Sequence, residues 1–104
     1  MSDWEEKRTE ETKRVERGLG RYFPTVQAYR QNSASIRVRV IDKQFEGKTR
    51  EEREALAMPH IMALPKRTRE DITMIILLAP SELKTKGVHV LTNHEFEHPL
   101  MSNL

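Results

Sequence analysis

The segment from residue 35 to residue 80 constrains the fold more than any other part of this 104-residue chain. It opens with alternating residues, in which Ile36, Val38 and Val40 share one side of an extended strand and Arg37 and Arg39 share the other. It closes with the apolar run 72–79, which has the length of a strand. A helical pattern lies between the two strands. This order predicts two parallel strands, side by side, joined by a helical crossover.

The helical connection begins with a capping box. The hydroxyl of Thr49 can accept a hydrogen bond from the amide of Glu52, whose carboxylate can reach back to the amide of Thr49. Acids in a first turn also suit the positive end of the helix dipole. We therefore interpret Glu51, Glu52 and Glu54 as residues that start a helix, not as acid–base groups.

Two prolines divide the region after the cap. Pro59 predicts either two short helices or one bent helix, and Pro65 ends it. Residues 66–69 then read as an exposed basic link. His60 falls on the buried side of the helix, where a core or interface role is the simplest interpretation.

Upstream of the crossover, helical spacing of apolar residues predicts one helix from about residue 5 to residue 22, ended by Pro24. Trp4, which precedes it, either frays or docks on the core. Residues 26–30 and 36–41 then form a hairpin around the polar segment 31–34. One sheet face is apolar, whereas the other is partly exposed to solvent and carries arginines.

The last strand is apolar on both sides apart from Thr73, which predicts a strand that is central or covered on both faces. Either the segment 84–104 or a second copy of the chain supplies the missing cover. Val88, Val90 and Leu91 are candidates within that segment, and beyond Thr92 the chain reads as a polar tail.

The resulting fold class is α+β, a small α-β-β-α-α-β domain with a three-stranded mixed sheet and helices on one face. We divide the chain into a charged N-terminal extension of the first helix (residues 1–12), the α+β domain (residues 13–83) and a C-terminal extension or tail (residues 84–104).

Composition limits the classes of function. The chain has no cysteine, and so no disulfide, thiol nucleophile or thiolate metal site. It begins without the basic and apolar segments of a secretory signal, and its longest apolar run is too short to cross a bilayer. These features predict a cytoplasmic protein with no membrane partner.

No catalytic constellation emerges from the sequence, and we predict a non-enzyme without a cofactor. Serines lack a nucleophile elbow, and the glycine pair at positions 18 and 20 ends a helix instead of following a strand. His94 and His98 are four residues apart, with His89 nearby. Pro99 and the polar surroundings favour a tail over a metal site.

Basic residues, together with the uncovered part of the last strand, supply the candidate contact surface. The net charge is +2, but cations outnumber acids along parts of the chain. A solvated surface is the simplest interpretation, and binding of nucleic acid or of an acidic protein face is the alternative. The candidate residues are Arg37, Arg39, Lys48, Arg50, Arg53, Lys66, Arg67 and Arg69.

The order of elements resembles that of the BolA-like family, whose fold is similar to type II KH domains. The matching residues are the strand end 38–42, the motif Phe45-Glu46-Gly47, Arg53 in the helix and Ile72 at the start of the last strand. The similarity covers roughly residues 12–83.

The resemblance implies an adaptor. BolA-like proteins pair with monothiol glutaredoxins and share an iron–sulfur cluster through histidine, or histidine and cysteine. Here Thr73 stands where that family carries its histidine, and the loop 31–34 has neither ligand type. A hydroxyl is a poor iron donor. We therefore expect an interaction protein without the usual cluster ligand, with self-association as a further alternative.

The KH relationship implies a second alternative, nucleic-acid binding. KH domains grip single strands with a Gly-x-x-Gly loop between two helices. The corresponding position, Met58-Pro59, has no glycine. Binding would then depend on the basic residues alone and would not read sequence.

Overall fold

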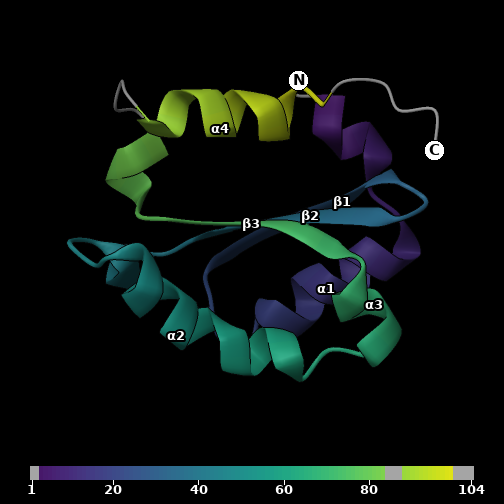
Figure 1. Cartoon of the computed structure of the whole chain (residues 1–104), viewed down its shortest axis with the longest axis horizontal. Coiled ribbons are helices and arrows are strands. Elements are labelled where there is room, and N and C mark those ends of the chain that lie inside the picture. The colour runs from purple at the N-terminus through teal and green to yellow at the C-terminus, as the bar shows by residue number, and fades with distance from the viewer. Residues whose placement is uncertain (1–2, 84–87, 100–104) are drawn as a thin grey trace.

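The computed structural model describes residues 3–83 and 88–99, and for residues 88–91 it describes the backbone alone. These residues form three strands between helices (Figure 1). The elements, in chain order, are η1 (Asp3–Lys7), α1 (Glu10–Leu19), β1 (Thr25–Asn32), β2 (Ser35–Ile41), η2 (Lys43–Phe45), α2 (Arg50–Met62), α3 (Lys66–Glu70), β3 (Ile72–Leu78), η3 (Pro80–Leu83) and α4 (Val88–Glu97), where η marks a 3₁₀-helix.

The sheet confirms the predicted crossover. Its strand order is β1-β2-β3, with β1 and β2 antiparallel and β2 and β3 parallel. Ile36 pairs with Ile72 and Ile41 pairs with Leu78, so α2 and α3 bridge neighbouring strands that run in the same direction. The register shifts between Ile36 and Arg37, which makes Thr73 the extra residue of a β-bulge. β3 lies at the edge of the sheet, not at its centre.

One face of the sheet carries the main core, as predicted. Val15 and Leu19 of α1 and Ala57 and Ile61 of α2 pack with the apolar side of β1 and β2. Figure 1 shows α1, α2 and α3 together on this side. The inward-facing β2 residues Ile36, Val38 and Val40 are fully buried.

The other face is covered by η1 and α4, so helices lie on both faces of the sheet and not on one as predicted. Of the two covers expected for the last strand, the C-terminal segment supplies it. Trp4 of η1 and Phe96 of α4 pack against Tyr29 of β1 and against Ile76 and Leu78 of β3. The ring centroids of Trp4 and Phe96 lie 5.7 Å apart. The expected polar tail beyond Thr92 is therefore wrong, because α4 continues to Glu97 and buries Phe96 completely.

The side chains of Val88, His89, Val90 and Leu91 lie outside the described residues, as do residues 84–87 and 100–104. The role that we expected for Val88, Val90 and Leu91 stays a prediction. Within the described ranges, none of the helices combines the length and the hydrophobicity that crossing a membrane requires.

The predicted first helix is two helices. η1 ends at Lys7, and α1 begins only after Thr9, whose hydroxyl accepts a hydrogen bond from the Thr12 amide while the Thr12 hydroxyl caps the Thr9 amide. This break lets η1 fold over the far face of the sheet. Trp4 docks on the core and is 7% exposed.

The capping box of α2 is confirmed. The Glu52 amide donates to the Thr49 hydroxyl at 3.2 Å, and the Thr49 amide donates to the Glu52 carboxylate at 2.8 Å. Pro59 lies within one helix, and α3 follows Pro65 as a separate element. The predicted exposed basic link 66–69 is thus part of a helix, and Thr68 within it is buried.

The Phe-x-Gly motif has a structural explanation. Phe45 is fully buried in the main core, and Gly47 has a φ of 71°. A side chain at this φ is strained, so glycine suits the turn that leads into α2. Both residues position the start of α2 next to the end of β3.

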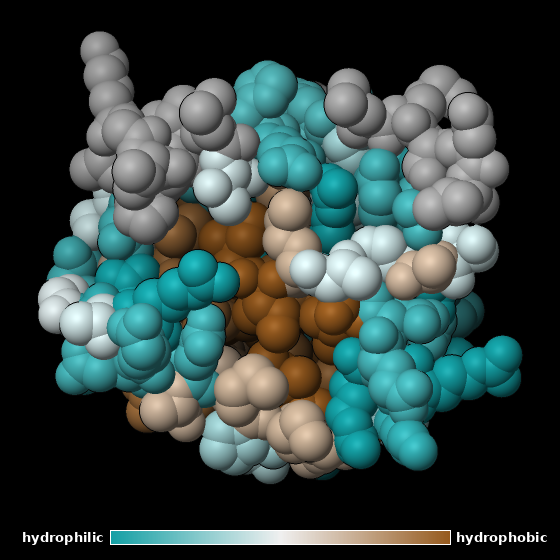
Figure 2. Space-filling model, in the orientation of Figure 1, coloured by the Kyte–Doolittle hydropathy of each residue, from teal (hydrophilic) through white to brown (hydrophobic). Residues whose placement is uncertain are grey.

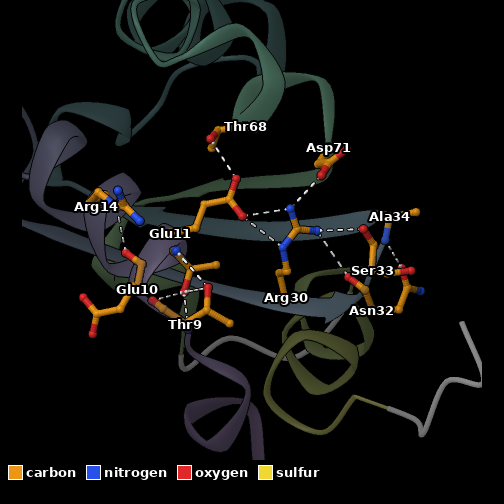
Figure 3. A network of polar contacts seen from close by, with 11 residues as sticks. Thr9, Glu10, Glu11, Arg14, Arg30, Asn32, Ser33, Ala34, Thr68 and Asp71 are labelled. Atoms are coloured by element: carbon orange, nitrogen blue, oxygen red, sulfur yellow. Dashed lines mark hydrogen bonds and ion pairs between the residues drawn. The ribbon is translucent and has the colours of Figure 1, made fainter.

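A polar network fixes the start of β3 (Figure 3). The Arg30 guanidinium donates to the Glu11 carboxylate at 2.8 Å and to Asp71 at 2.6 Å. The Thr68 hydroxyl donates to the other oxygen of Glu11 at 2.8 Å, and this bond holds the pKa of Glu11 below its usual range. The hydrogen bond to Asp71 raises the pKa of Arg30. The network ties α1, the hairpin and α3 together.

Candidate functional site

A groove of about 540 Å³ follows the outer edge of β3 between the two helical layers. Figure 2 shows it as a hollow of apolar side chains within a mostly hydrophilic surface, at the place where β3 lies in Figure 1. β3 lines it from Thr73 to Leu78, and α2 and Thr92 of α4 contribute to its walls. A second hollow of about 250 Å³ lies between β3 and α2.

The backbone of β3 is half unpaired along this groove. Within the described residues, β3 pairs with β2 alone. The Leu78 carbonyl points inward, because it accepts a hydrogen bond from the Asp42 amide at 2.9 Å. Each residue of a parallel strand turns its amide and carbonyl to the same side, and its neighbours turn theirs to the other. The backbone groups of Ile75 and Leu77 therefore point outward, into the groove.

The two sides of β3 face different walls. Ile75 and Leu77 pack with the main core beside α2, whereas Met74, Ile76 and Leu78 belong to the layer beneath η1 and α4. A strand placed beside β3 would likewise direct alternate side chains to either wall. The walls contain apolar side chains, among them Ala57, Met58 and Ile61 of α2.

Arg53 closes one end of the groove. Its guanidinium donates to the Leu77 carbonyl at 2.9 Å and to the two Glu82 carboxylate oxygens at 2.6 and 3.1 Å. It also donates to the Lys48 carbonyl at 3.0 Å. Only 10% of the side chain is exposed. Arg53 is thus a structural clamp between α2, the end of β3 and η3.

Two of the predicted basic residues lie beside Arg53 on the rim of the groove. Lys48 and Arg50 are exposed, and Arg50 pairs with Glu54 at 3.0 Å. Of the eight predicted site residues, Lys48, Arg50 and Arg53 are the three that line this groove.

The arginines of β2 do not form the wet surface that the alternation indicated. Arg39 is 4% exposed and donates to Gln27, Asn93 and Glu97 at 2.7, 3.2 and 2.8 Å. Arg37 is half-buried and donates to the Tyr29 hydroxyl at 3.2 Å. These side chains hold α4 on the sheet.

Tyr29 completes this buried polar arrangement beneath α4. Its hydroxyl donates to the Phe96 carbonyl at 2.8 Å. Burial raises the pKa of Tyr29 above its usual range. The phenol is therefore a fixed hydrogen-bonding group of the second layer, not a solvent-exposed acid.

The three basic residues of α3 lie apart from the groove. Lys66 approaches Glu70 at 4.0 Å, and Arg69 donates to the carbonyls of Met62 and Leu64. Arg67 is exposed and lines a different hollow beside α1. The eight basic residues therefore do not act as one exposed surface.

Metal-binding side chains do not gather in the described part of the chain, where no group of three histidine or acidic residues lies close enough to hold an ion. The rings of His94 and His98 are 4.9 Å apart, and His98 approaches Asp3 at 3.5 Å. The side chain of His89 lies outside the described residues. Thr73, which the predicted resemblance aligned with a histidine of BolA-like proteins, is exposed and shares a hydrogen bond with the Ser35 hydroxyl.

The opposite edge of the sheet, along β1, is guarded by side chains. The outward amide of Ala28 donates to the Glu16 carboxylate at 2.9 Å, and Glu16 is held in turn by Arg8. Lys7 reaches the carbonyl of Gln31, the bulged residue of β1, at 3.5 Å.

Comparison with known proteins leaves the family open, since no protein-family model, curated protein or solved structure matches the chain. The fold is a small α+β domain, and the resemblance to BolA-like proteins stays a prediction. The basic set pointed to one end of the groove through Lys48, Arg50 and Arg53. The sequence analysis placed part of the contact surface on the uncovered part of the last strand but did not single out Ile75 and Leu77, because the apolar run does not show which backbone groups face outward.

Proposed function

We propose that this protein is a non-catalytic interaction module that binds its partner by accepting an extended strand along the free edge of β3. The single observation that carries the proposal is an edge strand that, among the described residues, pairs on one side only and turns the amide and carbonyl of Ile75 into a groove lined by apolar side chains of β3 and α2. An exposed edge of this kind is a ready template for another strand.

Strand addition explains why backbone and side chains are arranged together at this edge. Main-chain hydrogen bonds to the amide and carbonyl of Ile75 and to the Leu77 amide supply affinity, since Arg53 occupies the Leu77 carbonyl. Pockets for alternate side chains supply specificity. The inserted strand directs one set of side chains toward α2 and the other toward α4. An adaptor needs such a surface and no catalytic group, in agreement with the role that the BolA-like resemblance implies.

The cations on the rim indicate which charge a bound strand should carry, and at which end. Lys48 stands at the end of the groove next to Leu77, because Arg53 donates to the carbonyls of both residues, whereas Arg50 also lines the groove and is paired with Glu54. An acidic residue at the matching end of the incoming strand gains a favourable interaction there, which is screened by salt.

A peptide titration tests the proposal. The probe is a short acetylated peptide of alternating valine and threonine with one terminal glutamate, added to isotope-labelled protein and followed by the backbone amide signals in NMR. We expect shifts in β3 and at the start of α2. The matched control is the same peptide with N-methylated backbone amides, which keeps the side chains but cannot donate to an edge strand.

Thr73→Lys supplies a second control within the protein. Thr73 is exposed, so the variant keeps the fold while it places a charge at the groove. We expect it to weaken binding of the peptide. Equal binding of the N-methylated peptide, or shifts confined to other elements, would overturn the proposal.

A further inference from the structure

The free edge of β3 is symmetric about Ile75. The bulge at Thr73 limits it on one side, and the Arg53 guanidinium on the Leu77 carbonyl limits it on the other. Both limits lie two residues from Ile75. The outward amide and carbonyl of Ile75 are thus the centre of the segment that another strand can reach.

Antiparallel pairing of this segment with itself uses these groups completely. Residues directly opposite in an antiparallel pair exchange two hydrogen bonds when their backbone groups face each other. A twofold axis that passes midway between the two Ile75 residues places the Ile75 amide of each copy opposite the Ile75 carbonyl of the other. A self-complementary contact of this kind is the rule in twofold dimers.

The side chains agree with this register. A twofold axis perpendicular to the sheet keeps the α2 side of one copy on the α2 side of the other. Ile75 then meets its own copy, Met74 meets Ile76, and Thr73 meets Leu77. The pairs at the centre are apolar, and cross-strand pairs of this type stabilise a sheet by about 0.2–1 kcal/mol each.

Between the bulge at Thr73 and the Arg53 guanidinium, this edge also lacks, among the described residues, the charges and prolines that commonly prevent self-pairing. Natural proteins place lysines, prolines or inward-pointing charges on exposed edge strands. β3 has no charged residue and no proline from Ile72 to Leu78, whereas β1 is guarded by Glu16 and Lys7. A second copy is therefore the partner with a matching strand that is always present.

We propose that two copies of this chain pair their β3 strands antiparallel about a twofold axis midway between their Ile75 residues, so that the two sheets form one sheet of six strands. This inference rests on the proposed function and names a second copy as the occupant of the edge. Because η1 and α4 already cover the second face of β3, the second copy pairs with its edge and not with a face.

Sedimentation velocity over a concentration series tests the dimer. We expect the 12.2-kDa chain to sediment with twice its mass and to dissociate on dilution. Thr73→Lys and Ile75→Lys shift the chain to the monomer, because each puts a charge into the paired edge. Met62→Lys is the matched control, since Met62 is 53% exposed on α2 and does not line the groove.

A cross-link tests the register. The chain has no cysteine, so Ile75→Cys introduces the only thiol. Opposite residues of a hydrogen-bonded antiparallel pair have Cα atoms about 5.5 Å apart, within reach of a disulfide. Oxidation of Ile75→Cys should give a covalent dimer at protein concentrations at which Met62→Cys gives none.

A wild-type chain that stays monomeric at every concentration would overturn the inference, and so would equal cross-linking of the two cysteine variants. The peptide titration then separates the two proposals. A monomer whose β3 amides shift with the peptide keeps the proposed function and loses the self-pairing. A monomer that ignores the peptide loses both.

Discussion

The two edges of the sheet expose the same kind of backbone groups but differ in whether side chains hydrogen-bond to them. At β1, the carboxylate of Glu16 occupies the outward amide of Ala28, and Lys7 occupies the carbonyl of the bulged Gln31. At β3, Arg53 binds the Leu77 carbonyl at one end, whereas the backbone groups of Ile75 at the centre face the groove. Side chains of this protein therefore satisfy outward backbone groups along β1 but leave those at the centre of β3 open.

The same contrast extends to the side chains. The outer side of β1 is bordered by α1, which contributes Glu16. β3 is bordered by α2 and α4, which leave a groove between them instead of a side-chain cap. An open edge beside a groove lined by apolar side chains of β3 and α2 is an arrangement that suits strand addition.

The largest expected effect comes from removal of the Arg53 guanidinium at β3. Arg53→Ala leaves the Glu82 carboxylate half-buried without its guanidinium, and loss of one partner of a buried pair costs about 3–5 kcal/mol. We expect a large drop in the free energy of unfolding, measured by urea denaturation with circular dichroism. Arg50→Ala is the control: its side chain is 85% exposed, and the change should stay within about 0.5 kcal/mol. Equal losses in the two variants would contradict the clamp.

Removal of the Glu16 carboxylate at β1 has the next largest expected effect. It would leave both edges of the sheet open. Glu16→Ala leaves the buried Ala28 amide unsatisfied, at a cost of about 1–3 kcal/mol. A chain with two open edges can pair at both, so we expect species larger than a dimer in sedimentation velocity. Glu10→Ala changes an exposed carboxylate of the same helix and should leave the distribution unchanged. If the Glu16 variant keeps the wild-type distribution, the carboxylate is not a guard.

The smallest expected effect comes from the polar network of Glu11, Arg30, Thr68 and Asp71, which links β1 to the start of β3. Thr68 and Arg30 hold the pKa of Glu11 below its ordinary value of 4.5. Its stabilisation is therefore complete above pH 4.5 and is lost as the pH falls through the lower pKa of the folded state. Glu11→Gln should cost about 1.5 kcal/mol near neutral pH and flatten the acid limb of the stability curve. Glu10→Gln, at a side chain that is 78% exposed, is the control. An unchanged acid limb in Glu11→Gln would exclude this role.

Local patterns predicted the framework of the fold. The alternation of Ile36, Val38 and Val40, the apolar run of β3 and the capping box at Thr49 are each read from neighbouring residues, and the structure has all three. These signals work because strand and helix periods are properties of a short segment. The parallel pairing of β2 and β3 followed from the helix between them.

Contacts between distant segments were not predictable in the same way. Trp4 and Phe96 are single apolar residues in polar surroundings, and neither creates a helical period. They are buried because η1, α4 and Tyr29 meet in space. Arg39 illustrates the same limit: alternation places it on the polar side of β2, but Asn93 and Glu97 from the far end of the chain bury it.

The candidate site was predictable in part. The apolar run on both sides of β3 indicated that something must cover this strand, and Arg53 was singled out by the family resemblance. The strand order decides that β3 is an edge, and the position of α4 decides how wide the groove is. Both depend on packing across the whole sheet.

The position of Trp4 has a practical consequence, because it is the single tryptophan of the chain. Its indole lies against Tyr29 and Phe96. Its fluorescence therefore depends on whether α4 is docked on the sheet. Intrinsic fluorescence would follow the attachment of that helix separately from the melting of the main core. A red shift that precedes the loss of far-ultraviolet ellipticity would show the helix lifting while the rest of the molecule stays folded.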